Sequence, residues 1–324
     1  MNIDAASATD LLRIDPQVET DRIVANIRDV VFNQLKRRGA VIGVSGGIDS
    51  GVVAFLCARA LGNERLQILF TPEAESSPDS LRLGRMVAES LNAPSAVEDI
   101  SRILADARCY ERRDDAVRLV VPEYGAGYKC KIVLPNVLDA SRYSIFSVVV
   151  QSPDGQSKKV RLNPAAYLGI VAATNFKQRA RKMIEYYYAD LLQFAVAGTP
   201  NRLEYDLGFF VKNGDGAADF KPIAHLYKSQ VYQLAEYLGV PDEIRRRPPT
   251  TDTYSLDQSQ EEFYFTLPLE KMDLCLYGKN NGMSAAEVAP LARMDAGQVE
   301  RIYKMIESTR KAARYLHAAP AVLE

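Results

Sequence analysis

A strand, a glycine turn and a helix follow one another in residues 40–62 (AVIGVSGGIDSGVVAFLCARALG), and this stretch constrains the fold most strongly. The run from Ala40 to Val44 is short, apolar and rich in β-branched side chains, which is typical of a buried parallel strand. An apolar pattern of helical period follows the turn and continues to Leu61. Backbone N–H groups and the positive end of the helix dipole therefore meet at one point, which favours a bound phosphate.

The turn itself has the sequence SGGIDS, in which the glycines allow close backbone approach and Ser45 and Ser50 add hydroxyl groups. Asp49 is unusual there, because a carboxylate repels a phosphate unless a cation lies between them. A bridging Mg²⁺ removes that conflict, so the turn predicts a Mg-nucleotide site. The alternative is a glycine pair that only turns the chain. The sequence matches neither the P-loop, which needs Gly-Lys-Ser/Thr, nor the dinucleotide pattern Gly-x-Gly-x-x-Gly.

Strands and helices alternate on both sides of this turn, which predicts an α/β fold with a doubly wound, mainly parallel sheet. Ligands of such sheets bind at the carboxyl ends of the strands, where SGGIDS and the later turn TPEAESSPDS both lie. Glu73, Ser76 and Ser77 are therefore candidates to border the nucleotide, with a solvated loop as the alternative. The expected elements are helices at 17–38, 49–61, 79–91, 172–190, 225–241 and 284–316 and strands at 40–44, 66–71, 96–100 and 191–201.

Residues 109–165 break this alternation, because three β-like segments occur there and Ser-Pro-Asp-Gly suggests a hairpin between two of them. We expect a β-rich insertion in a single domain that spans 1–324. A lid, a dimer contact and simple padding all remain open as its role.

Composition narrows the function. The 324 residues are 47% hydrophobic, which is enough for a large core. The net charge is −1, and this balance of charges disfavours a protein that binds nucleic-acid backbones. The four cysteines are scattered without a C-x-x-C pair, so we expect reduced thiols. The sequence shows no signal pattern and no membrane span, and we expect a cytoplasmic protein.

The SGGIDS turn resembles the pyrophosphate loop of the PP-loop ATP pyrophosphatases. Several further stretches, in order, resemble NAD synthetase, the ammonia-dependent synthetase domain of that superfamily. They are TPEAESSPDS, NFKQRARKM, the segment from GTPNRLE through GDGAAD to YKSQ, and RPPTTD, and together they cover about two thirds of the chain. The resemblance implies an adenine nucleotide alpha hydrolase-like fold. It also implies an AMP-forming C–N ligase that adenylates the carboxylate of deamido-NAD with ATP and amidates it with ammonia.

The same resemblance implies roles for individual residues. Asp49 and Lys228 would be catalytic, Asp49 and Glu204 would hold Mg²⁺, and Asn175, Arg179, Lys212 and Asp219 would hold deamido-NAD. The residues that would bind ATP are Gly43, Val44, Ser45, Gly46, Gly47, Ile48, Asp49, Ser50, Thr199, Lys228 and Thr250.

Two segments depart from the family pattern. The family's late His-Lys pair is absent, with Arg310-Lys311 and His317 as the nearest candidates, and Gln258 and Glu261 stand where a Gln-x-Asp-Glu stretch is expected. Both segments lie near the acceptor in the family, so a PP-loop amide ligase for another carboxylate is the alternative function. The resemblance implies a homodimer. The chain leaves no room for a fused glutaminase, so ammonia would arrive free or from a separate one.

Overall fold

Four parallel strands form the central sheet of the computed structural model, which describes residues 10–134, 146–248, 254–256 and 267–323. Their order is β3-β2-β1-β7, and the register sets Ile42 beside Ile68 and Val41 beside Val196. The strand bounds are Ala40–Gly43 for β1, Leu66–Phe70 for β2, Ser95–Val97 for β3 and Ala195–Val196 for β7.

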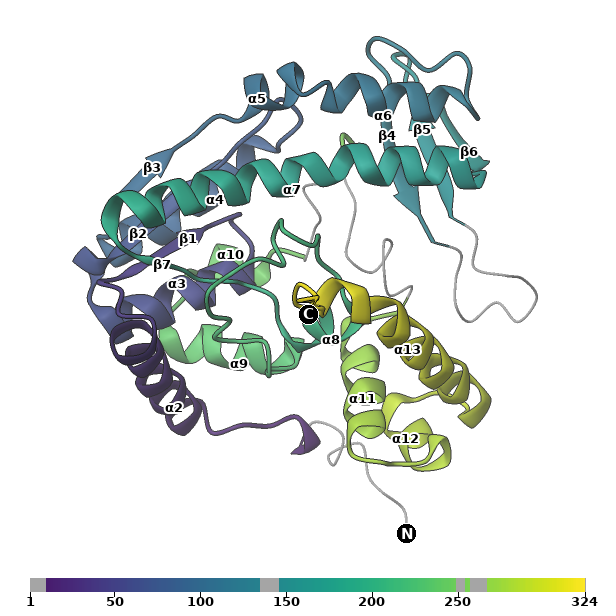
Figure 1. The fold of residues 1–324 in the computed structure, drawn as a ribbon. Helices are drawn as coiled ribbons and strands as arrows, with labels where there is room; N and C mark the ends of the chain where they lie inside the picture. The colour runs from purple at the N-terminus through teal and green to yellow at the C-terminus, as the bar shows by residue number, and fades with distance from the viewer. Residues whose placement is uncertain (1–9, 135–145, 249–253, 257–266, 324) are drawn as a thin grey trace.

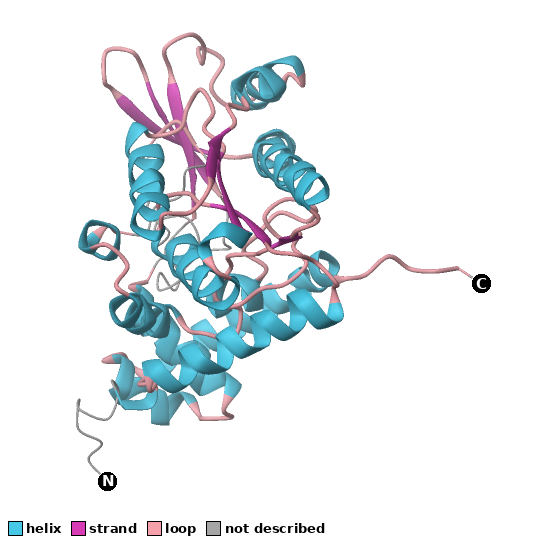
Figure 2. Cartoon of the chain, turned by 90° about the vertical axis from the view of Figure 1, so that its left-hand side faces the viewer, coloured by secondary structure: helices cyan, strands magenta, loops and turns pink. Residues whose placement is uncertain are grey.

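Helices cover both faces of this sheet (Figure 2), because successive side chains of a strand point to opposite sides. Ala40 and Ile42 face one core, and Val41 faces the other, where it packs with Ala189 of α7 (Pro164–Leu192). The first core is completed by α2 (Pro16–Arg28), α3 (Ile48–Leu61), α4 (Pro78–Leu91), α9 (Lys228–Leu238) and α10 (Asp242–Arg246). The predicted doubly wound α/β fold is confirmed.

The long helix α7 reaches from the central sheet to a second, smaller sheet (Figure 1). Asn163 caps its first turn by accepting a hydrogen bond from the Ala166 amide at 2.8 Å. Its 29 residues give a length of about 43 Å. Two shorter helices, α5 (Ser101–Asp106) and α6 (Cys109–Arg118), pack along it.

The predicted β-rich segment is only partly β. The strands β4 (Lys129–Val133), β5 (Ser147–Gln151) and β6 (Ser157–Arg161) form an antiparallel sheet in that order. Residues 109–118, however, form helix α6, and the segment runs into α7 at Pro164. The helical start is explained by burial, because side chains of α6, α7, β4 and β5, such as Val117, Ile170 and Val148, make one apolar cluster.

The C-terminal part is helical, as predicted for 284–316. Its helices α11 (Leu269–Asn280), α12 (Ala285–Ala292) and α13 (Ala296–His317) share an apolar core with α8 (Arg202–Leu207). No helix in the part of the chain that the structure describes is long and apolar enough to cross a membrane.

Other predicted boundaries also shift, and the strand expected at 96–100 is β3, which ends at Val97. The helix expected at 17–38 ends as α2 at Arg28 and continues as a π-helical turn, Asp29–Gln34. A short 3-10 turn, Asn63–Arg65, precedes β2. The strand expected at 191–201 shrinks to β7, because α7 continues through Leu192 and stops at Gln193, which has a left-handed φ of 57°.

Candidate active site

The turn after β1 is held by its own serine hydroxyls. Ser50 Oγ donates a hydrogen bond to the Gly47 carbonyl at 3.0 Å and accepts one from the Ser45 amide at 3.3 Å. The Gly47 amide in turn donates to Ser45 Oγ at 3.3 Å. Gly47 is the N-cap residue of α3, and among the described residues no side chain caps this helix. The backbone N–H groups of its first turn therefore remain available to an anion.

Gly46 is required by this geometry. Its φ of +76° lies in the left-handed region, and an added Cβ would lie 2.7 Å from the Ser80 carbonyl oxygen and 2.9 Å from Leu83 Cβ. Gly43 is also tightly placed, since a Cβ there would lie 2.7 Å from a Glu185 carboxylate oxygen of α7. The two glycines therefore let α4 and α7 close on the turn.

Two elements, α8 and α9, bring polar side chains to Asp49. Lys228, the first residue of α9, forms an ion pair with Asp49 Oδ2, and Asn201 Nδ2 donates to Oδ1 at 3.1 Å. The side chain of Asn201 also caps α8, and its backbone N–H donates a hydrogen bond to Glu204 Oε2 at 3.1 Å, which completes a capping box. Asn201 and Lys228, which stand 152 and 179 positions beyond Asp49, thus contact it, and the family resemblance had implied that Lys228 and Glu204 act with Asp49.

Two carboxyl groups, those of Asp49 and Glu204, lie around the single ammonium group of Lys228 at this site. Burial, and after it the charge of Asp49, raise the pKa of Glu204 to about 8, although Lys228 acts in the opposite direction. Burial acts to lower the pKa of Lys228, but Asp49 and Glu204 outweigh it and the pKa is raised. A cation bound beside Glu204 would favour the ionised form of this carboxyl group, which burial and Asp49 disfavour.

The donor set fits Mg²⁺, which prefers carboxylate oxygens together with phosphate oxygens and water. Asp49 and Glu204 supply two carboxylates. Among the residues that the structure describes, no group of three or more His, Cys, Asp or Glu is arranged to hold a metal ion. Phosphate oxygens and water must therefore complete the coordination of an ion held here.

Asp273 of α11 fixes the start of α9, and so the position of Lys228. This buried carboxylate accepts hydrogen bonds from the Lys228 amide at 3.2 Å and the Ser229 amide at 2.8 Å. Burial raises its pKa to about 6, even though these amides and the Lys228 charge favour the ionised form. The C-terminal helices thus support the site from behind.

A cavity of about 340 Å³ opens at the carboxyl ends of β1, β2 and β7. This is the edge expected for the ligand of a doubly wound sheet, and the volume is in the range of small-ligand pockets. Most sequence-predicted site residues line it, namely Gly43, Val44, Ser45, Gly47, Ile48, Asp49, Ser50, Asn175, Thr199, Glu204 and Lys228.

Four predicted residues do not line the cavity. Gly46 packs against α4 behind the turn. The Arg179 guanidinium donates to the Lys212 carbonyl at 3.3 Å, and Lys212 Nζ donates to the Tyr315 carbonyl at 2.8 Å. Asp219 accepts from the Val196 amide at 2.7 Å. The substrate-binding roles of Arg179, Lys212 and Asp219 stay predictions.

The segments that depart from the family pattern are only partly visible. Thr250, Gln258 and Glu261 lie outside the described residues. Arg310 pairs with Asp206 of α8 and donates to Asn280, and no contact places it or Lys311 at the cavity among the described residues.

His317 is placed closer to the cavity than Arg310. Its Nε2 lies 2.9 Å from the Tyr205 carbonyl oxygen, and its ring meets Phe210 edge-on with centroids 5.0 Å apart. Because Phe210 lines the cavity, His317 supports that wall from outside.

Apart from Asn175, the residues of α7 that line the cavity were missed by the sequence reasoning. Along this helix, positions three or four apart line the cavity: Val171, Thr174, Asn175, Gln178, Arg181, Lys182 and Glu185. Lys182 and Glu185 form a buried ion pair there. The available signal was the repeat of polar residues at helical spacing, which marks a helix face that meets a polar site.

Tyr254 is a second missed residue, and the small sheet holds it at the cavity. The Cys130 amide of β4 donates to Ser255 Oγ at 2.9 Å, and the Leu256 amide donates back to the Cys130 carbonyl at 3.3 Å. Tyr254 is buried in the apolar cluster of this sheet and lines the cavity. No local sequence signal indicates this long-range contact.

Comparison with known proteins gives a consistent family. The model of the NAD synthase family matches residues 19–119 and 147–314. An NH(3)-dependent NAD(+) synthetase of Rhizobium meliloti (strain 1021) is 58% identical over 317 residues, which are 98% of this chain and 95% of that protein. A protein of the same description from Thermotoga neapolitana is 34% identical, over 91% of this chain and 93% of its own length.

Solved structures show the same fold. An NMN synthetase from Francisella tularensis has a TM-score of 0.67 at 22% identity, with 96% of this chain and 99% of that chain covered. An NH3-dependent NAD synthetase from Campylobacter jejuni, in complex with nitrate, has a TM-score of 0.63 at 23% identity, with 96% and 100% covered. With its family match and its 58% identity to a full-length relative, the chain belongs to the NAD synthase family.

Proposed function

We propose that this protein converts deamido-NAD to NAD with ATP and ammonia, and releases AMP and pyrophosphate. Two relatives that are 58% identical over nearly their whole length are described as NH(3)-dependent NAD(+) synthetases. The observation that carries the proposal is that Asp49, Glu204 and Lys228 meet at the SGGIDS turn and line one cavity with it. ATP is therefore held where its phosphates can be activated.

In the first step, a carboxylate oxygen of the nicotinic acid ring attacks the α-phosphorus of ATP. The bond from this phosphorus to the bridging oxygen breaks, and pyrophosphate leaves. The amides at the start of α3 and the hydroxyls of Ser45 and Ser50 bind the departing phosphates, and Lys228 balances their growing charge. Mg²⁺ held by Asp49 and Glu204 would supply further charge neutralisation.

In the second step, ammonia attacks the acyl carbon of the adenylate, the bond from carbon to the AMP oxygen breaks, and the nitrogen loses a proton. No protein nucleophile is needed, because the substrate itself is activated. Asn175 lines the same cavity and is a candidate contact for the nicotinic acid end.

We further propose that the protein acts as a homodimer. Support comes from apolar side chains on the outside of α7 at helical spacing: Met183, Tyr187 and Leu191 are 55%, 59% and 62% exposed. Arg179 lies on the same helix and is also exposed. Packing of two such helices would bring Arg179 into an interface, where a dinucleotide longer than one cavity could reach it.

The remaining proposals concern the setting of the reaction. Ammonia reaches the site free or from a separate glutaminase, and the enzyme works in the cytoplasm, where ATP is abundant.

A coupled assay tests the function. Purified protein with ATP, Mg²⁺ and ammonium should form AMP and NAD in equal amounts from deamido-NAD. The mononucleotide of nicotinic acid and free nicotinic acid serve as alternative carboxylates. Formation of pyrophosphate with another acid, while deamido-NAD stays inert, would overturn the proposal in favour of a different amide ligase.

A further inference from the structure

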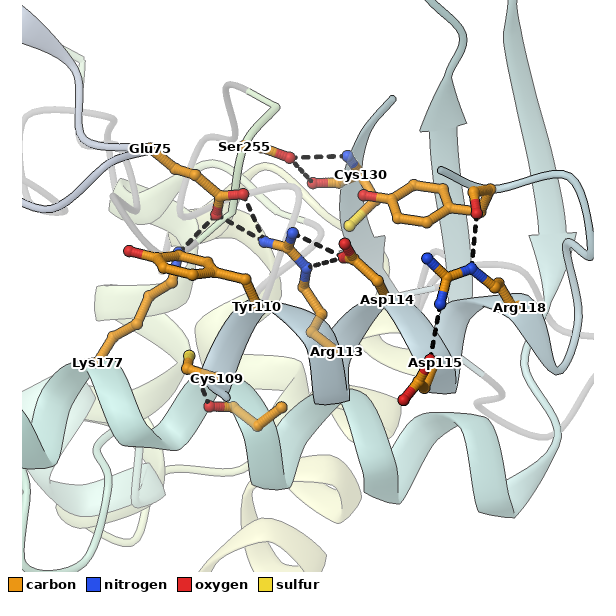
Figure 3. A network of polar contacts seen from close by, with 12 residues as sticks. Glu75, Cys109, Tyr110, Arg113, Asp114, Asp115, Arg118, Cys130, Lys177 and Ser255 are labelled. Carbon is orange, nitrogen blue, oxygen red and sulfur yellow. Dashed lines mark hydrogen bonds and ion pairs between the residues drawn. The ribbon is translucent and has the colours of Figure 1, made fainter. Parts of the chain in front are cut away.

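A network of buried ion pairs lies behind the loop that follows β2 (Figure 3). Lys177 Nζ of α7 lies 2.8 Å from Glu73 Oε1 and 2.7 Å from Glu75 Oε2. Arg113 Nη1 of α6 lies 2.7 Å and 2.6 Å from the two oxygens of Glu75. Glu75 is therefore held by two cations that come from two different helices.

These charges are deeply enclosed. The side chains of Lys177 and Glu73 are 1% exposed and that of Arg113 is 5% exposed. Burial acts to raise the pKa of Glu75, but Lys177 and Arg113 outweigh it and the pKa is lowered. Because moving ions out of water is costly, such a network adds little stability over apolar packing, and its presence calls for another reason.

The other side of the same loop faces the cavity. Thr71, Pro72, Ser76 and Ser77 line the cavity, whereas Glu73 and Glu75 are not among its lining residues. The Glu73 amide donates to Ser76 Oγ at 3.1 Å, and the Ser76 amide donates to the Glu73 carbonyl at 2.9 Å. The carboxylates of Glu73 and Glu75 and the hydroxyls of Ser76 and Ser77 thus lie on opposite sides of one tight turn. A shift of the carboxylates would therefore also shift the hydroxyls.

Each cation keeps a second partner if Glu75 is removed. Lys177 retains Glu73, and Arg113 retains Asp114, whose carboxylate lies 2.8 Å from Nη2. Glu73 additionally accepts a hydrogen bond from the Tyr110 hydroxyl at 2.7 Å. Loss of Glu75 would therefore leave Glu73 as the carboxylate that attaches the loop to α6 and α7, without leaving a buried charge unpaired.

We propose that Glu75 is a positioning residue for the nucleotide, because its pairs with Lys177 and Arg113 hold the 71–77 loop so that Ser76 and Ser77 meet ATP. The inference rests on the proposed function in one respect, which is that ATP occupies this cavity. It also gives a role to α6, the first part of the predicted insertion, since Arg113 comes from this helix.

Calorimetric titration with Mg-ATP tests the proposal in three variants of the full chain. Glu75→Ala should weaken ATP binding about tenfold, and Glu75→Gln, which keeps an acceptor oxygen, about threefold. Glu111→Ala is the matched control, because Glu111 is an exposed carboxylate on α6 that pairs with Arg108, and it should bind ATP as the wild type does.

Steady-state kinetics separate positioning from general destabilisation. The KM for ATP should rise in Glu75→Ala while kcat at saturating ATP and the KM for deamido-NAD stay within about twofold. Unchanged ATP affinity, or equal losses for both substrates together with a lower Tm, would overturn the proposal. If Glu75→Ala does not fold, the ATP titration of Glu75→Gln decides, since equal affinity to the wild type would then overturn it.

The ATP titration needs no acceptor. A wild type that binds ATP but does not amidate deamido-NAD contradicts the proposed function and leaves the positioning role to be decided by the variants. A wild type that binds no Mg-ATP contradicts both.

Discussion

At the scale of single residues, the site depends on charges and spaces that local sequence only partly reveals. The strand, turn and helix around Ser45–Ser50 were predictable, because the residues that form them follow one another within about twenty positions. The pairing of Asp49 with Lys228 and Glu204 was predictable only through a family resemblance. Neither apolar period nor composition indicates contacts across 150 positions or more.

The charge of Asp49 is expected to be essential for turnover. Asp49→Asn keeps the shape of the side chain but removes the partner of Lys228 and one proposed Mg²⁺ ligand. We expect kcat to fall about 10²–10³-fold, as for loss of one group that stabilises transition-state charge. The rate of AMP release measures this loss, and Asp106→Asn, at an exposed carboxylate, is the control that should keep the rate of the wild type. Full turnover by Asp49→Asn would refute the metal and charge argument together.

Gly46→Ala should combine backbone strain with a steric clash. The substitution places a Cβ at a φ of +76° and 2.7 Å from a carbonyl oxygen, so we expect a loss of about 2–3 kcal/mol in unfolding free energy and weak ATP binding. Gly155→Ala, at a φ of +86° with nothing within 4 Å, isolates the strain and should cost about 1 kcal/mol. Chemical denaturation compares them, and equal losses would contradict a tightly packed turn.

At the scale of elements, helix α7 shows what sequence patterns miss. Its apolar period predicted a helix, but seven of its residues on one face turn out to line the cavity. The β-rich segment began with a helix because side chains of α6 are buried against α7, a tertiary contact that overrides local preference. Strand β7 shortened for a related reason, since α7 continues into the predicted strand.

The contact between α11 and α9 predicts a dependence of stability on pH. The pKa of Asp273 is raised from 3.8 to about 6 by burial, so the folded state binds its proton more tightly than the unfolded state does. The stability that Asp273 gains from its tighter proton binding is fully present below pH 3.8 and is lost as the pH rises through 6.

Urea unfolding of the wild type and of Asp273→Asn at pH 4 and pH 7 measures this effect. The unfolding free energy of the wild type relative to the variant should fall by about 2 kcal/mol between the two pH values. A difference that stays constant, or that grows with pH, would contradict a raised pKa in the folded protein.

At the scale of the whole molecule, two sheets and a helical C-terminal part meet around one cavity. The turn after β1 of the central sheet lines the cavity, the small sheet holds Tyr254 at it, and the C-terminal helices support Lys228 through Asp273. Single-domain organisation with an insertion remains a prediction, and so does the dimer.

The proposed dimer can be tested on α7. Tyr187→Asp introduces a charge into the exposed apolar face and should convert a dimer into a monomer in sedimentation velocity. Leu119→Asp, at another apolar position that is 58% exposed, should leave the assembly unchanged. We also expect a higher KM for deamido-NAD in the Tyr187 variant, with ATP affinity retained. A wild type that sediments as a monomer would refute the proposal.

The central claim is that the acceptor carboxylate is activated as an adenylate, and oxygen labelling tests it most directly. Deamido-NAD with both carboxylate oxygens replaced by ¹⁸O is converted with ATP, Mg²⁺ and ammonium, and mass spectrometry measures the ¹⁸O content of each product. Attack on the α-phosphorus predicts one ¹⁸O in AMP, one in the amide of NAD and none in pyrophosphate. AMP without label, or label in pyrophosphate, would contradict the account.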